Sequence, residues 1–216
     1  MKKKIEWLIP IVLFIIGIIC ILIRLIVKGS SAITFQFIWA NLLGIILILY
    51  PILGKILKIE MPLFLEIILA IHILISVNLG TAYRIYDYIS WWDLLAHGYF
   101  GLEAGIIAYL ILIHVNGHDI KLIGKIIYFY VFALGLGAMW EIIEYLNDSI
   151  TGGDCQHVYD VAPGVSPVAD TIEDLMITFA GVTVFSIVFI IDYFNKKKII
   201  NYMDKDFGYI ENNKMD

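Results

Sequence analysis

Three short stretches of the sequence place ionisable side chains inside segments that are otherwise apolar. The stretches are WWDLLAHG, WEIIEYL and DTIEDL, and the residues concerned are Asp93, His97, Glu141, Glu144, Asp170 and Asp174. The first pair stands at positions i and i+4, so a helix projects both side chains from one face, about 6 Å apart along its axis. Charged groups at membrane depth are costly, and they usually mark a functional surface or a buried polar network.

The chemistry that these residue types favour is the binding of a divalent cation. The six residues are five carboxylates and one histidine. Carboxylates at close range cannot all stay ionised unless a cation balances their charge, so the group must take up protons or cations. Oxygen-rich ligation suits Mg, Mn or Ca, whereas the histidine keeps Zn or Fe as less favoured alternatives. His97, Glu141 and Asp174 are then the candidates for catalytic roles, with all six residues as candidate metal ligands.

The composition identifies the class of protein in which these residues lie. The chain of 216 residues is 61% hydrophobic and 16% charged, with a mean hydropathy of +0.87, which is too apolar for a soluble globular domain. It predicts a polytopic membrane protein that contacts the lipid bilayer. The net charge of -5 and the lack of a basic stripe argue against a nucleic-acid partner. Two cysteines, Cys20 and Cys155, exclude a disulfide framework. Nothing in the pattern indicates an oligomeric state.

Hydropathy predicts an all-α bundle of about six transmembrane helices in a single domain over residues 1–195, followed by a polar cytoplasmic tail over 196–216. The predicted spans cover residues 7–27, 33–53, 62–79, 91–115, 122–146 and 170–194. The first span has the charge order of a signal peptide, with a cleavage-like Ser30-x-Ala32. Its length and the trailing Arg24 favour retention as a helix.

The distribution of Lys and Arg orients these spans. With both termini in the cytoplasm, 12 of the 15 basic residues lie on the cytoplasmic side. The three motifs then meet near the outer end of the bundle, in an upper layer and a lower layer. The upper layer contains Asp93, Glu144 and Asp170, and the lower layer contains His97, Glu141 and Asp174.

A loop of some twenty residues, 148–169, connects the last two predicted spans above this cluster. Its length and its Gly and Pro content are typical of lids and binding loops. Cys155 and His157 could add ligands, although one C-x-H spacing is weak evidence. A structural alternative for the whole cluster is that the acids cap helices and pair with Arg84, Trp indoles and backbone amides.

The motifs also carry a family resemblance over roughly residues 66–194. The pattern W-D-x3-H-x3-G from Trp92, W-E-x2-E from Trp140 and D-T-x2-D from Asp170 resembles the YjdF-type bacterial inner-membrane proteins. That resemblance implies a multi-pass protein of the bacterial cytoplasmic membrane and no particular activity. The order and spacing are also similar to VanZ-like proteins. Glu144 and Asp174 stand where that second pattern has glutamine and asparagine.

Three classes of function remain open from the sequence. The first is a metal-dependent, membrane-embedded enzyme that acts on a lipid-linked or envelope substrate at the outer face. The second is a protein that binds or transports a cation or a cationic ligand, such as a small molecule or a lipid head group. The third is a structural membrane protein with a buried polar network.

Overall fold

The computed structural model of the chain describes residues 2–28, 63–82, 84–115, 117–159 and 166–206. All regular elements within these ranges are helical, which confirms the predicted all-α fold. Helices in four ranges are long and apolar enough to cross a membrane: Phe64–Thr81, Trp92–His114, Leu122–Ile150 and Pro167–Phe194. The predicted span over residues 33–53 lies outside the described residues. The predicted count of six spans therefore stays a prediction.

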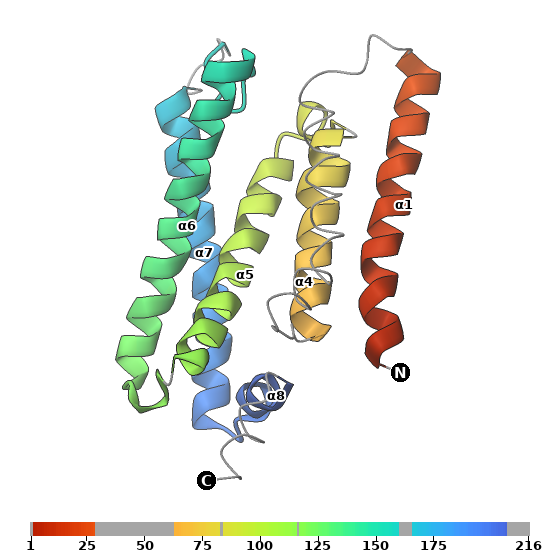
Figure 1. Cartoon of the computed structure of the whole chain (residues 1–216). Helices are drawn as coiled ribbons and strands as arrows, with labels where there is room; N and C mark the ends of the chain where they lie inside the picture. The colour runs from red at the N-terminus through yellow and green to blue at the C-terminus, as the bar shows by residue number, and fades with distance from the viewer. Residues whose placement is uncertain (1, 29–62, 83, 116, 160–165, 207–216) are drawn as a thin grey trace. The chain divides into compact units, whose positions relative to one another are not determined.

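The chain forms two compact units, of which the first is Met1–Ala96. It contains α1 (Lys2–Lys28), α4 (Leu63–Ile73) and the π-helical turns η2 (Leu74–Ala82), followed by the short 3₁₀ helix η3 (Ile85–Asp87). Helix α1 packs against α4 and η2 (Figure 1). These helices cover the predicted spans 7–27 and 62–79.

The second unit, His97–Asp216, carries most of the predicted site. Its helices are α5 (Trp92–His114), α6 (Leu122–Thr151), α7 (Pro167–Phe194) and α8 (Lys198–Asp206). The first five residues of α5 precede the unit. A 3₁₀ turn, η4 (Gly117–Asp119), connects α5 to α6. The helices predicted over 91–115, 122–146 and 170–194 are therefore present. The single domain predicted over residues 1–195 stays a prediction, because each unit is described by itself.

Two helix ends differ from the predicted boundaries because of capping. Helix α6 continues to Thr151 and ends at Gly152, whose left-handed φ of 68° lets its N–H donate to the carbonyl of Asp148 at 2.9 Å. Helix α7 starts at Pro167, after Ser166 as N-cap. The Ser166 hydroxyl accepts from the N–H of Ala169 at 3.1 Å. Hydropathy alone misses the end of α6 because residues 147–151 are mostly polar, and it misses the start of α7 because the Ser166 cap is not a hydropathy signal.

Helix α8 lies within residues 196–216, which the sequence predicts to be a polar tail. Ile200 and Met203 are buried, whereas Ile199 and Tyr202 are exposed. Its first turn is capped by Asp192 near the end of α7, whose carboxylate accepts from the N–H groups of Ile199 and Ile200 at 3.1 and 2.9 Å. This cap fixes α8 to α7.

Aromatic side chains form the core of the second unit. Phe129 of α6 lies 5.2 Å, between ring centroids, from both Phe185 and Phe189 of α7. Tyr109 of α5 lies 5.0 Å from Phe189. Tyr109 and Phe129 are almost completely buried. Helices α6 and α7 pack along one another, as Figure 1 shows, and the ring contacts attach α5 to both.

Closer to the polar residues, α5 and α7 approach until their backbones touch. A Cβ atom added to Gly101 would overlap the carbonyl oxygen of Thr178, and one added to Gly181 would overlap the carbonyl oxygen of Gly98. Small residues allow such contact between helices in membranes, where hydrophobic burial drives association weakly. The glycines therefore set the register between α5 and α7.

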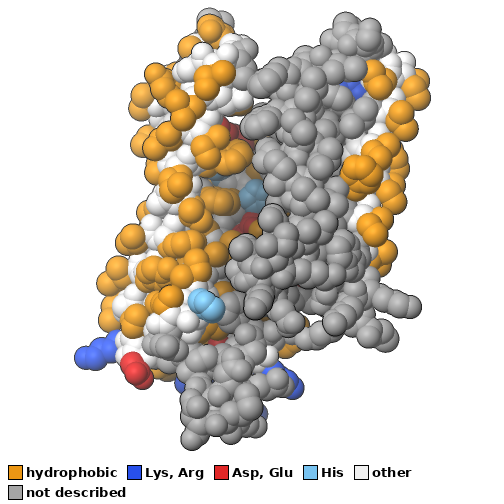
Figure 2. Space-filling model, viewed as in Figure 1, with side chains coloured by type: hydrophobic (Ala, Val, Ile, Leu, Met, Phe, Trp, Pro, Cys, Tyr) orange, Lys and Arg blue, Asp and Glu red, His pale blue; other side chains and the backbone are white. Residues whose placement is uncertain are grey.

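The outward faces of these helices are apolar. Figure 2 shows hydrophobic side chains over the visible face of the described helices. Exposed examples are Ile123, Ile127 and Val131 on α6 and Met176, Val184 and Ile191 on α7. An exposed apolar surface of this extent suits lipid rather than water as the surrounding solvent.

The α5–α7 contact predicts a strong difference between two glycine substitutions. Gly101→Ala should destabilise the protein by about 1–3 kcal/mol, because the methyl group meets backbone that can move only if the helices separate. Gly135→Ala on α6 is the control, since an added Cβ has nothing within 4 Å. It should be neutral or stabilising by up to ~1 kcal/mol. Unfolding in detergent measures both, and equal effects of the two variants would contradict this packing.

Candidate metal centre

Asp174 is the carboxylate that lies at the centre of the predicted cluster. It belongs to a stripe of buried residues along α7 that repeats every three or four positions and continues through Thr178, Gly181 and Phe185. The residue is only 2% exposed. The spacing of a helix thus places this acid on the face of α7 that packs into the unit, rather than on its lipid-facing side.

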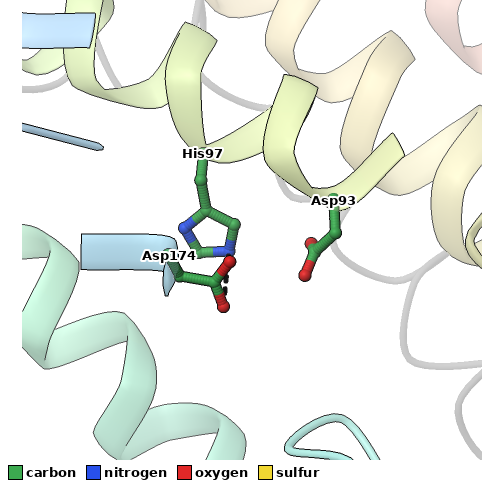
Figure 3. Close-up of side chains that lie close together, drawn as sticks. All are labelled: Asp93, His97 and Asp174. Carbon is green, nitrogen blue, oxygen red and sulfur yellow. Dashed lines mark ion pairs between the residues drawn. The ribbon is translucent and has the colours of Figure 1, made fainter. Parts of the chain in front are cut away.

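On one side of Asp174 lies the histidine of α5. His97 Nε2 is 3.7 Å from Asp174 Oδ2, and both side chains are buried. Asp93 stands one turn before His97 on the same continuous helix, and one of its carboxylate oxygens lies within 4.8 Å of a His97 ring nitrogen. Figure 3 shows Asp93 and His97 projecting from the same side of α5, as the i, i+4 spacing predicts.

Helix α6 contributes the other two acids near Asp174. Glu141, Glu144 and Asp174 each offer one carboxylate oxygen, and these three atoms lie within 4.8 Å of one another. Glu141 is 5% exposed. The Trp140 indole N–H donates to Glu144 Oε1 at 2.8 Å, which orients this less buried carboxylate.

The two oxygens of Glu141 have different surroundings. Oε2 accepts a hydrogen bond from the Thr171 hydroxyl at 2.9 Å. Oε1 is buried and has no hydrogen-bond partner among the described residues. A buried polar atom without a partner costs about 1–3 kcal/mol, and more when it is charged. The geometry therefore leaves one oxygen of Glu141 in need of a proton or a cation.

Asp170 lies in the first turn of α7, one helical turn before Asp174. It belongs to neither of the two groups of close ligand atoms, which are Asp93, His97 and Asp174, and Glu141, Glu144 and Asp174. Its Oδ1 lies 3.9 Å from Nε2 of His157 in the loop after α6. The predicted upper and lower layers stay a prediction. Of the six predicted site residues, the structure therefore assigns Asp93, His97, Glu141, Glu144 and Asp174 to the two groups.

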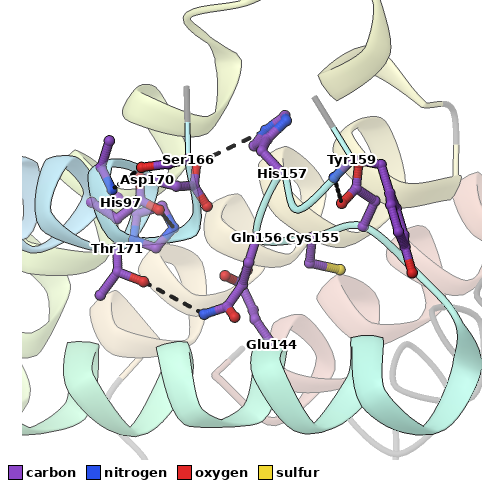
Figure 4. Close-up of polar contacts among 12 residues, drawn as sticks. His97, Glu144, Cys155, Gln156, His157, Tyr159, Ser166, Asp170 and Thr171 are labelled. Carbon is purple, nitrogen blue, oxygen red and sulfur yellow. Dashed lines mark hydrogen bonds and ion pairs between the residues drawn. The ribbon is translucent and has the colours of Figure 1, made fainter. Parts of the chain in front are cut away.

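The described part of the loop covers Glu141. Asp148 accepts from the backbone N–H groups of Cys155 and Gln156 at 2.9 and 3.0 Å, which fixes the turn. Gln156 is thereby buried, with its side-chain nitrogen 3.3 Å from the Glu141 carbonyl and 3.5 Å from the Thr171 hydroxyl. Figure 4 shows Gln156 reaching across to Thr171.

The Cys155-x-His157 spacing does not bring its two side chains together on one ion. Cys155 Sγ lies 3.3 Å from the Asn147 side-chain nitrogen, and Cys155 belongs to neither ligand group in the described part of the chain. His157 is near Asp170 instead. Residues 160–165 of the predicted lid lie outside the described residues.

Two polar residues of the centre are absent from the sequence predictions. Thr171 follows Asp170 in the DTIEDL motif, and its place three residues before Asp174 could have identified it as a partner for another helix. Gln156 has no comparable signal in the sequence, because only the turn around Asp148 positions it. Both hold Glu141 rather than adding a charge.

The spacing of the acids is compatible with one shared ion. Two oxygen ligands of a single cation lie at most twice the metal–oxygen distance apart, which is about 4.0–5.2 Å for bonds of ~2.0–2.6 Å. The 4.8 Å limit for Glu141, Glu144 and Asp174 falls in that range. His97, beside Asp174, adds a group that can donate or accept a proton near pH 7.

Comparison with known proteins agrees with the membrane class. Residues 10–195 match the family described as "Predicted membrane protein (DUF2238)", which covers most of the chain. No curated protein and no solved structure matches. The similarity to VanZ-like proteins stays a prediction, whereas the YjdF-type proteins are members of the matched family. The chain therefore belongs to the DUF2238 family of membrane proteins.

Proposed function

We propose that this membrane protein binds a divalent cation at a centre formed by Glu141, Glu144 and Asp174, with His97 beside it. The observation that carries the proposal is the buried Oε1 of Glu141, which has no hydrogen-bond partner among the described residues and belongs to a side chain in the three-carboxylate group. Its other oxygen is held by Thr171, so the carboxylate is oriented before any ion binds.

Charge balance supports a cation over an unliganded cluster. Three carboxylates with oxygens within 4.8 Å of one another repel strongly when they are buried. Protons shared among the acids are one way to relieve this repulsion, and a divalent ion is the other. The ion also supplies a partner for Glu141 Oε1. Shared protons would supply such a partner only if the carboxylates changed their orientation. Oxygen ligands favour Mg, Mn or Ca over Zn or Fe.

A second candidate function is metal-dependent catalysis, and His97 is the observation that favours it. A structural ion needs ligands only, whereas His97 places an acid or base 3.7 Å from the carboxylate that would hold the ion. In a hydrolytic reaction the cation would activate water, and His97 would transfer the proton. Incubating the metal-loaded protein with membrane lipid extract, followed by mass spectrometry for new products, tests this function. His97→Gln should abolish product formation, and equal products from wild type and this variant would exclude the role.

We also propose that the centre lies near the outer face of a bacterial cytoplasmic membrane, with both termini inside. The support is the predicted excess of Lys and Arg on the cytoplasmic side. Among the described residues of the second unit, the basic ones lie at the start of α6, just after α7 and in α8. The acids of the proposed cation site, Glu141, Glu144 and Asp174, lie near the end of α6 and the start of α7.

Binding of the cation should stabilise the fold measurably. A ligand present at one hundred times its dissociation constant adds about 2.7 kcal/mol to the free energy of unfolding. Chelation should therefore lower the thermal midpoint of the wild type, while Glu141→Gln should respond little to chelator. Glutamine keeps an oxygen for Thr171 but removes the charge at Oε1. Elemental mass spectrometry of detergent-purified protein identifies the ion.

The matched control is Glu173→Gln. Glu173 is exposed on α7 and lies next to Asp174 in sequence, so the substitution removes the same charge outside the cluster. It should retain both the ion and the response to chelator. Purified wild type without a stoichiometric ion, together with a midpoint that neither chelator nor added Mg, Mn, Ca or Zn alters, would refute the proposal in favour of shared protons.

The position of the loop predicts the pH dependence of thiol labelling. Desolvation, together with the carboxylates of Asp148 and Glu144, raises the pKa of the Cys155 thiol to about 12. Because the thiolate is the reactive form, labelling of Cys155 should be slow at pH 7 and rise about tenfold per pH unit through pH 9.5. A maleimide that does not cross membranes should reach it from outside intact cells.

A cysteine at exposed position 149 provides the control. Ser149→Cys, combined with Cys155→Ser and Cys20→Ala, should label rapidly and level off near an ordinary thiol pKa of ~8.5. If Cys155 levels off at the same pH, the thiol pKa is not raised by its surroundings, and this account of the loop is wrong. Labelling of the position-149 variant only after permeabilisation would reverse the proposed topology.

A further inference from the structure

At the other end of the second unit, a pocket of about 210 Å³ lies where α5, α6, α7 and α8 meet. The residues on which the argument rests are Tyr109, Lys125, Tyr193, Lys197, Asn201 and Asp204. None of them belongs to the acidic centre. The volume is below the ~300–1,000 Å³ of pockets that enclose drug-sized ligands, so it suits a small polar group.

Two lysines from different helices line this pocket. Lys125 of α6 is only 8% exposed, which is unusual for a lysine in any protein. Lys197 precedes α8, and its ammonium lies 4.6 Å from the centre of the Tyr193 ring. Lys125 and Lys197 are far apart in the sequence, so only the packing of α6 against the end of α7 brings both side chains to one pocket.

The backbone at Lys197 is held in a conformation that lysine rarely adopts. Its φ of 48° lies in the left-handed region, which is unfavourable for a residue with a side chain. Asp192 maintains this turn: its carbonyl accepts from Lys197 N–H at 3.1 Å, and its carboxylate caps α8. Strain of this kind persists where the surroundings enforce it, and it often accompanies a ligand site.

The charges that line the pocket leave a net positive balance. Asp204 is the acidic residue among the lining side chains, and it accepts a hydrogen bond from the Tyr109 hydroxyl at 2.6 Å. Two ammonium groups and this one carboxylate line the pocket, and Asp119 outside the lining also interacts electrostatically with Lys125. A ligand with a single negative charge complements the two lysines. Asn201 adds an amide that can bond to an oxygen. A phosphate diester has this charge and these acceptor atoms.

The position of the pocket favours a phosphate that belongs to a lipid. It lies where the apolar ranges Leu122–Ile150 and Pro167–Phe194 begin and end, respectively, which is the level of head groups for helices that cross a bilayer. Helix α8 adds exposed Ile199 and Tyr202 beside it. Basic pockets between transmembrane helices at the cytoplasmic surface are a recurring site for anionic lipid head groups.

We propose that this pocket, with Lys125 and Lys197 as its cationic groups, binds the phosphate of an anionic phospholipid head group. The lysines bind the phosphate oxygens. Asp204 accepts hydrogen bonds from the rest of the head group, and Asn201 donates hydrogen bonds to it. This binding is independent of the acidic centre, so either proposal can fail without the other.

Native mass spectrometry and thermal unfolding of the full chain in detergent test the proposal. The probes are short-chain phosphatidylglycerol, short-chain phosphatidylcholine and inorganic phosphate. Phosphatidylglycerol should bind and raise the thermal midpoint more than phosphatidylcholine does. Lys125→Gln and Lys197→Asn should each weaken the binding of phosphatidylglycerol on the order of tenfold, because each variant removes one charge-assisted hydrogen bond to the phosphate. Asparagine tolerates the left-handed backbone at position 197, so this variant removes the charge of Lys197 without disturbing the turn.

Lys196→Gln is the matched control, because Lys196 is exposed, is adjacent in sequence and does not line the pocket. It should bind phosphatidylglycerol as the wild type does. A different result would be that inorganic phosphate binds and depends on Lys125 and Lys197, whereas phosphatidylglycerol does not bind. That result would assign the pocket to a soluble phosphate compound and overturn the proposal of a lipid ligand. Equal losses in Lys196→Gln and Lys197→Asn, or no preference for phosphatidylglycerol over phosphatidylcholine, would overturn the site itself.

Discussion

The backbone contact between α5 and α7 is the constraint on which the polar centre depends. Gly101 of α5 meets the backbone of Thr178, and Gly181 of α7 meets the backbone carbonyl of Gly98, with no room for a side chain at Gly101 or Gly181. His97 is the neighbour of Gly98, and Asp174 lies one turn before Thr178. The distance from His97 to Asp174 is therefore a consequence of the glycine contact, because a wider separation of the helices would remove the histidine from its carboxylate.

Helix α7 connects that contact to the rest of the unit. One buried stripe carries Asp174, then Gly181, then the aromatic residues Phe185 and Phe189, and finally Asp192, which caps α8. Polar residues thus occupy both ends of the stripe, and apolar packing occupies its middle. Burying Asp174 near Glu141 and Glu144 costs free energy that the aromatic core must offset, unless a cation compensates the charge.

The two ends of the second unit differ in charge, and each proposed site lies at one of these ends. Carboxylates gather where α6 ends and α7 starts, whereas lysines gather where α6 starts and α7 ends. A cation at the first end and a phosphate at the second each complement the local charge. Phe129, Phe185 and Phe189 pack together in the interior between them, so we expect the two sites to act separately rather than to form a continuous path.

The sequence by itself determined the class of protein, the helices of its second unit and most of its acidic centre. Apolar runs identify helices in a membrane because the backbone must satisfy its own hydrogen bonds there, and the i, i+3 or i, i+4 spacing of acids assigns each pair to one helix face. Tertiary structure alone decided which acids meet. Asp174 became central because glycine contacts set the register of α7. The loop after α6 places His157 3.9 Å from Asp170, a neighbour that the helix spacing does not predict. Gln156, Lys125 and Lys197 gained their roles from chain segments that are distant in sequence, and the pattern of residues within one helix contains no information about such neighbours.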